Sequence, residues 1–161
     1  MMWLQTTSCC LVMVAVAAAA VLAHQRRSRE DKHLVLRLRP GTEIKSALSE
    51  LNLNGGVVSC VGSTIRAVIR LANAAPGVSL QDSSLKIDKP MEILSLSGTL
   101  TRDGLHLHVS LGDELGNVVG GHLVSAVVHT TCELVILQLA QPMKRVFDAD
   151  TGFSELEPCG N

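Results

Sequence analysis

The fold is decided by MEILSLSGTLTRDGLHLHVSL, residues Met91–Leu111. The first half is a strand-like run, and Asp103-Gly104 after it supplies the positive φ angle that a tight hairpin turn needs. Beyond the turn, leucine or valine occupies every second position from Leu105 to Leu111, which is the period of a half-buried strand. The stretch therefore predicts an antiparallel β-hairpin.

One helix and further strands are expected on either side of this hairpin. Thr42 suits a helix N-cap, and apolar residues at helical spacing predict an amphipathic helix over 43–53. Strands are predicted for the remaining apolar or alternating runs, at 34–38, 56–61, 64–71, 123–128 and 132–139, with a last hairpin over 145–156. One early helix and about seven strands predict a single α+β domain with a mainly antiparallel β-sheet.

The composition excludes several classes of function. The chain has 161 residues, enough for one domain, and its net charge of −1 offers no basic surface to a polyanion. Aromatic residues make up 2% of the chain, so the core must be aliphatic and nucleic-acid bases would find few rings to stack on. No GxxxxGK[ST] or GxGxxG motif supports nucleotide binding.

The five cysteines form neither a CxxC motif nor a paired framework. Cys60 and Cys132 lie in apolar, strand-like runs, where a free thiol acts as a small hydrophobic group. This use of cysteine favours a reducing, intracellular compartment for the domain.

Residues 1–23 favour secretion or membrane attachment, because they carry no Asp, Glu, Lys or Arg and include an apolar run. Small residues at 21–23 suit a signal-peptidase site, whereas arginines placed after the run suit a membrane anchor. An upstream extension that the working protein lacks is the third interpretation. Membrane contact is expected only through this segment, with a charged linker at 24–32 and the globular domain at 33–158.

Three histidines stand in the apolar segment around the predicted hairpin. His106 and His108 are two positions apart, so they leave the same face of a strand with Cα atoms about 7 Å apart. A neighbouring strand could deliver His122 beside them, since Gly120-Gly121 lets the backbone approach closely. Three neutral imidazoles with an open fourth position suit a divalent metal, zinc above all. The alternative is that they are solvated residues on the polar face of a strand.

Catalysis at such a metal would need a carboxylate for proton transfer or for orienting a histidine. Asp113, in the turn between His108 and His122, is the candidate for that role. The alternative is that Asp113 is solvated or caps its own backbone, as carboxylates in such turns usually do.

Several motifs occur in a fixed order over residues 34–156. They are RLRPG, GVVSCVGS, IRLAN, MEILSLSGTL, HLHVSLGD, GGHL, TTCELVI and RVFDADTGFSEL. Together they resemble the PPC (plants and prokaryotes conserved) domain, in its free-standing type without an AT-hook. The family usually has phenylalanine where this chain has Met91, an exchange of one apolar group for another.

The resemblance implies an antiparallel sheet flanked by helices and assembled as a homotrimer. It also implies that His106, His108 and His122 gather as a metal-binding cluster. Plant relatives join the domain to AT-hooks, but the segment 37–40, Arg-Leu-Arg-Pro, has a core leucine where the hook needs glycine. Because the chain also has no net positive charge, direct DNA binding is not expected.

Three functions remain to be compared. The preferred one is a homotrimeric interaction module whose histidines bind a divalent ion, so the chain is not expected to be an enzyme. The second is a small metal-dependent enzyme of unknown substrate, in which Asp113 or a metal-bound water transfers protons. The third is an accessory DNA- or chromatin-associated protein by analogy with the plant relatives, which the missing hook disfavours.

Overall fold

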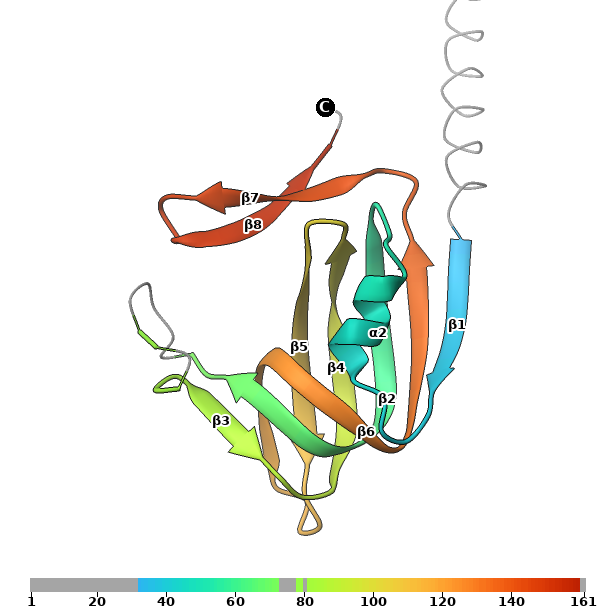
Figure 1. Ribbon diagram of the computed structural model, residues 1–161, viewed down its shortest axis with the longest axis vertical. Helices are drawn as coiled ribbons and strands as arrows, with labels where there is room; N and C mark the ends of the chain where they lie inside the picture. Colours follow the sequence, from blue (N-terminus) through green and yellow to red (C-terminus); the bar gives the residue numbers. More distant parts are fainter. Residues whose placement is uncertain (1–31, 73–77, 80, 160–161) are drawn as a thin grey trace, which may run out of the picture. The chain divides into compact units, whose positions relative to one another are not determined.

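The computed structural model describes residues 32–72, 78–79 and 81–159. Its elements, labelled in Figure 1, are β1 (Lys32–Leu38), α2 (Ile44–Glu50), β2 (Gly56–Arg70), β3 (Ser84–Ile87), β4 (Met91–Thr101), β5 (Gly104–Gly112), β6 (Val118–Gln138), β7 (Met143–Asp148) and β8 (Phe153–Pro158). The expected α+β class with a mainly antiparallel sheet is confirmed. The predicted segment 1–23 and residues 24–31 of the predicted linker 24–32 lie outside the described residues, and Lys32 begins β1.

The main sheet has the strand order β1-β6-β5-β4-β2-β3, and β6 also pairs with β2. Strands β6, β5, β4 and β2 therefore form a closed ring of antiparallel neighbours. Figure 1 shows β6 curving across the other strands, which lets one strand reach both β5 and β2. The predicted hairpin is confirmed as β4 and β5, with Thr101 opposite Gly104.

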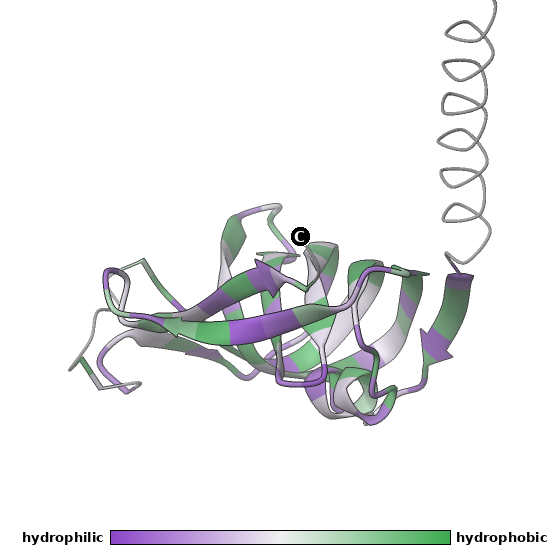
Figure 2. Ribbon diagram, turned by 90° about the horizontal axis from the view of Figure 1, so that it is seen from above, coloured by the Kyte–Doolittle hydropathy of each residue, from purple (hydrophilic) through white to green (hydrophobic). Residues whose placement is uncertain are grey.

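The core lies inside this ring because each strand points every second side chain inward. Leu96, Leu107, Leu111 and Leu123 are all fully buried. Figure 2 shows the corresponding alternation of hydrophobic and hydrophilic residues along the strands. As expected, the thiols of Cys60 and Cys132 belong to this core, with their Sγ atoms 2.9 Å apart. Because every second residue of β5 points into the core, the polar residues between them face outward.

The helical content differs from the expectation of flanking helices, since α2 is the one helix in the described part of the chain. It is also shorter than predicted. Its N-cap is Glu43 and not Thr42, because the Glu43 carboxylate accepts a hydrogen bond from Ser46 N at 2.6 Å. It ends before Asn52, whose φ of 48° is left-handed and stops the helix. None of the described helical structure is long and apolar enough to cross a membrane.

Two pairs of predicted strands are each one continuous strand. The runs at 56–61 and 64–71 merge into β2, and those at 123–128 and 132–139 merge into β6. Register shifts near Gly62 and Thr64 explain the difference, because a bulge interrupts the alternation of side chains without ending the strand.

The last hairpin is confirmed as β7 and β8, which pair only with each other among the described strands. It lies beside the β4–β5 turn, where Arg145 N donates to Asp103 Oδ2 at 3.3 Å (Figure 1). This contact brings a separate two-stranded unit to the end of the sheet that carries His106.

Candidate metal centre

His106, His108 and His122 leave the outer face of the sheet from two adjacent strands. His106 and His108 alternate with the buried Leu107 and Val109 of β5, so they point away from the core. His122 of β6 is the direct cross-strand partner of His108. Cross-strand partners share a face, so the register places the three imidazoles together.

The three side chains converge on one point. Their potential ligand nitrogens all lie within 4.8 Å of one another. His106 Nε2 and His108 Nε2 are 3.1 Å apart, and the ring centroids of His106 and His122 are separated by 5.0 Å. Ligands of a tetrahedral zinc ion at its usual Zn–N distance lie about 3.3 Å from one another, so small side-chain movements would complete such a site.

Burial favours the neutral form of two of these imidazoles. Desolvation, helped by the positive charge of Arg70, lowers the pKa of His122 to about 4. Desolvation and the nearby Arg145 also lower the pKa of His106. His122 Nδ1 is buried without a hydrogen-bond partner among the described residues. Neutral nitrogens with free lone pairs are what a zinc ion binds, so the residues present fit the metal.

Glycines let the strands come together at the cluster. A Cβ on Gly98 of β4 would lie 1.9 Å from the carbonyl oxygen of His106. A Cβ on Gly121 would lie 2.6 Å from the carbonyl oxygen of Arg70. The close backbone approach expected at Gly120-Gly121 is thus present, and it fixes where His122 stands.

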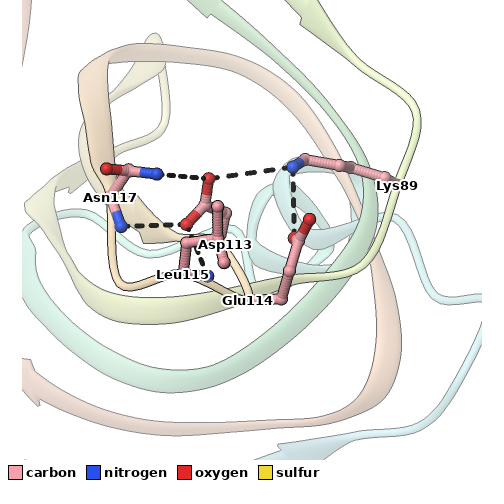
Figure 3. Close-up of polar contacts among 5 residues, drawn as sticks. All are labelled: Lys89, Asp113, Glu114, Leu115 and Asn117. Atoms are coloured by element: carbon pink, nitrogen blue, oxygen red, sulfur yellow. Dashed lines mark hydrogen bonds and ion pairs between the residues drawn. The ribbon is translucent and has the colours of Figure 1, made fainter.

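Asp113 lies elsewhere. Its carboxylate accepts hydrogen bonds from Leu115 N, Asn117 N and Asn117 Nδ2 at 2.8–3.1 Å, and Lys89 Nζ stands 3.8 Å from Oδ2 (Figure 3). It follows the end of β5, five positions beyond His108, or about 16 Å at the rise of a strand. The structure therefore does not bring Asp113 to the histidines, because β5 continues straight to Gly112 before the chain turns.

The family model of the Plants and Prokaryotes Conserved (PCC) domain matches residues 25–140. This chain belongs to that family. The predicted resemblance to the PPC domain is thereby confirmed.

Several known proteins are similar to the chain. A hypothetical protein of Salmonella cholerae-suis is 32% identical, with a TM-score of 0.71 over 80% of this chain and 93% of that one. A metal-containing protein of Archaeoglobus fulgidus is also 32% identical, with a TM-score of 0.66 over 78% of this chain and 93% of that one. The bifunctional protein GlmU of Synechococcus sp. (strain JA-3-3Ab) is 37% identical over 128 residues, 75% of this chain and 20% of that protein. The chain thus spans about a fifth of this curated relative.

The PCC-domain fold adds residues to the site that the sequence did not single out. Arg70 is the cross-strand partner of His122 on its other side, from β2. Arg145 of β7 donates from Nη2 to Thr99 Oγ1, and Thr99 is the partner of His106. The Arg70 guanidinium lies over the ring of Phe153 in β8, with its Cζ atom 5.0 Å from the ring centroid. The RVFDADTGFSEL motif contains Arg145 and Phe153 and predicts a hairpin. It does not predict where that hairpin lies relative to the histidines.

Arg70, Arg145 and Phe153 line a pocket of about 350 Å³ beside the histidines. His106 and His122 line this pocket together with Arg145, Phe153 and Glu155. A site of this kind joins a candidate metal cluster to a cavity large enough for a small ligand.

Proposed function

We propose that this PCC-domain protein binds one divalent transition-metal ion per protomer, zinc above all, through His106, His108 and His122. The observation that carries the proposal is the convergence of three potential ligand nitrogens within 4.8 Å from two strands. The similar protein from Archaeoglobus fulgidus is a metal-containing protein, which supports the proposal at 32% identity. When bound, the ion would supply a Lewis-acidic centre with a free coordination position.

The protein's own residues set the properties of this centre. Strands β5 and β6 hold the three imidazoles on a rigid sheet, so binding requires little ordering of the chain. The depressed pKa of His122 removes competition from protons at neutral pH. Asp113 has no part in this proposal because its carboxylate is occupied in its own loop.

The second part of the proposal is that the domain is a homotrimeric interaction module, as the family resemblance implies. Val57, Val61 and Val135 support self-association, since they are 41%, 54% and 51% exposed on the outer face of β2 and β6. Apolar groups gathered on one exposed sheet face are typical of a surface that another molecule covers. Light scattering of Val61→Asp should give a smaller mass than the wild type if this face is the interface. Val146→Asp, on β7, is the matched control.

Isothermal titration of chelator-treated protein with Zn²⁺ tests the metal proposal. One binding event per protomer is expected for the wild type, and none of comparable affinity for His122→Ala. The control His129→Ala changes an exposed histidine of the same strand and should bind as the wild type does. Equal binding by wild type and His122→Ala would overturn the assignment.

A further inference from the structure

We propose that the pocket beside the histidine cluster binds a small organic acid, whose carboxylate is held jointly by the metal ion and by Arg70 and Arg145. This inference rests on the proposed metal site and names the class of ligand that the site would take.

The charges of the pocket favour an anion. Its charged lining residues are Arg70, Arg145, Asp103 and Glu155, which cancel one another. Three imidazole ligands are neutral when they bind a metal, so they leave both charges of a divalent ion uncompensated. The metal-loaded pocket therefore carries about two positive charges, and an anionic ligand would neutralise them.

The two acidic residues already have partners within the protein. Asp103 Oδ2 accepts from Arg145 N at 3.3 Å, and Glu155 Oε1 accepts from Thr151 Oγ1 at 3.1 Å. The guanidinium groups are different. Among the ion pairs of the described residues, none involves Arg70 or Arg145. Arg70 is held by stacking on Phe153 and Arg145 by Thr99, so both keep N–H donors for a ligand.

The positions of the arginines match a carboxylate that also reaches the metal. Arg70 is directly beside His122 in the sheet, and Arg145 is held by Thr99, the cross-strand partner of His106. A planar guanidinium binds a carboxylate through parallel hydrogen bonds, which a point charge would not do. One carboxylate can therefore contact both a guanidinium and the ion.

The remaining walls suit a small, partly apolar ligand. Leu105 and Phe153 line the same pocket, whose volume is about 350 Å³. This is near the lower end of the range for small-molecule sites. A carboxylic acid with a short apolar body fits these features better than a nucleotide or a polymer.

The test uses the full chain loaded with Co²⁺, whose visible absorption reports changes in metal coordination. Benzoate is the probe, and benzamide is the uncharged molecule of the same shape. Benzoate should change the cobalt spectrum saturably, and benzamide should not. Arg70→Gln and Arg145→Gln should each weaken benzoate binding at least tenfold while binding the same amount of cobalt. Arg66→Gln, an exposed arginine of β2 outside the pocket, is the matched control.

The outcomes separate this inference from the metal proposal. One cobalt per protomer without a saturable effect of benzoate would overturn the carboxylate pocket and leave the metal site standing. Equal benzoate affinity in wild type, Arg70→Gln and Arg145→Gln would overturn the role of the arginines, and binding of benzamide would overturn recognition by charge. Failure to bind cobalt, with zinc titration also negative, would overturn both proposals.

Discussion

The Nε2 atoms of His106 and His108 lie 3.1 Å apart, although two residues of one strand face have Cα atoms about 7 Å apart. The two rings therefore lean toward a common point, and His122 reaches that point from the neighbouring strand. A hydrogen bond between the His106 and His108 imidazoles accounts for their own approach, but it does not account for His122, whose Nδ1 is buried without a hydrogen-bond partner among the described residues. The convergence is the strongest structural argument for a metal ion.

Zinc should stabilise the fold through this cluster. An ion that binds only the native state adds about 2.7 kcal/mol when its free concentration is a hundred times its Kd. We expect Zn²⁺ to raise the Tm of the wild type and EDTA to reverse the change. His122→Ala should have a Tm that neither reagent moves, whereas His129→Ala should respond as the wild type does. A similar zinc-dependent rise in His122→Ala would contradict the assignment.

Gly98→Ala should damage both the fold and the metal site. The added Cβ would stand 1.9 Å from the carbonyl oxygen of His106, so β4 and β5 would have to separate. We expect a loss of about 1–3 kcal/mol of unfolding free energy in urea, as for other overpacked positions, together with weaker zinc binding. Ser97→Ala, an adjacent change that adds no atoms, should preserve both. Unchanged zinc affinity in Gly98→Ala would show that zinc binding does not depend on the close approach of β4 and β5.

Asp113→Ala should lower stability without affecting the metal. Its carboxylate organises the 113–117 turn by accepting hydrogen bonds from Leu115 N and Asn117 N (Figure 3). Asp113 lies beyond the end of β5, five positions from His108. We expect the Tm to fall by a few degrees and the Zn²⁺ affinity measured by titration to equal that of the wild type. A marked loss of zinc affinity would restore Asp113 as a residue of the site.

Glu43 should make stability depend on pH in the acid range. Burial raises the pKa of this carboxyl, but hydrogen bonds from Ser46 and Ala126 N outweigh it, and the net pKa is lowered. A carboxyl with a lowered folded-state pKa stabilises the protein above its unfolded-state pKa, and this contribution is lost as the pH falls through the folded-state value.

The substitution Glu43→Gln isolates that contribution. Glutamine offers one acceptor oxygen where the carboxylate uses two, so one backbone N–H loses its partner. We expect a loss of about 1–2 kcal/mol at pH 7 by urea unfolding, which shrinks as the pH falls through the lowered folded-state pKa of Glu43. Glu50→Gln, at the exposed end of α2, should show no such trend. A constant difference across this pH range would refute the linkage.

The sequence predicted most of the fold because alternation and turn chemistry are local. The hairpin around Asp103-Gly104 and the late hairpin both follow from residues close to one another in the chain. The continuity of β2 and of β6 was missed because a bulge interrupts the alternation of side chains just as the end of a strand does. The helix starts one residue later than predicted because Glu43 caps it through Ser46 N, and the same carboxylate also accepts a hydrogen bond from the distant Ala126 N.

The candidate site was predictable only in part, for the same reason. His106 and His108 share a strand face by their spacing alone, whereas His122 was a candidate only if a neighbouring strand delivered it, which the motif resemblance also implied. Arg70 and Arg145 come from β2 and β7, and their place follows from the closed sheet and from the contact of Arg145 with Asp103. No local pattern in the sequence contains that information.

The most direct measurement is the metal content per protomer of the purified protein, determined by elemental analysis beside the His106→Ala/His108→Ala variant and the His129→Ala control. We predict close to one zinc or other divalent transition-metal ion in the wild type and in His129→Ala, and almost none in the double variant. Wild-type protein that stays free of metal after exposure to Zn²⁺, or a double variant that retains the same amount, would contradict the account.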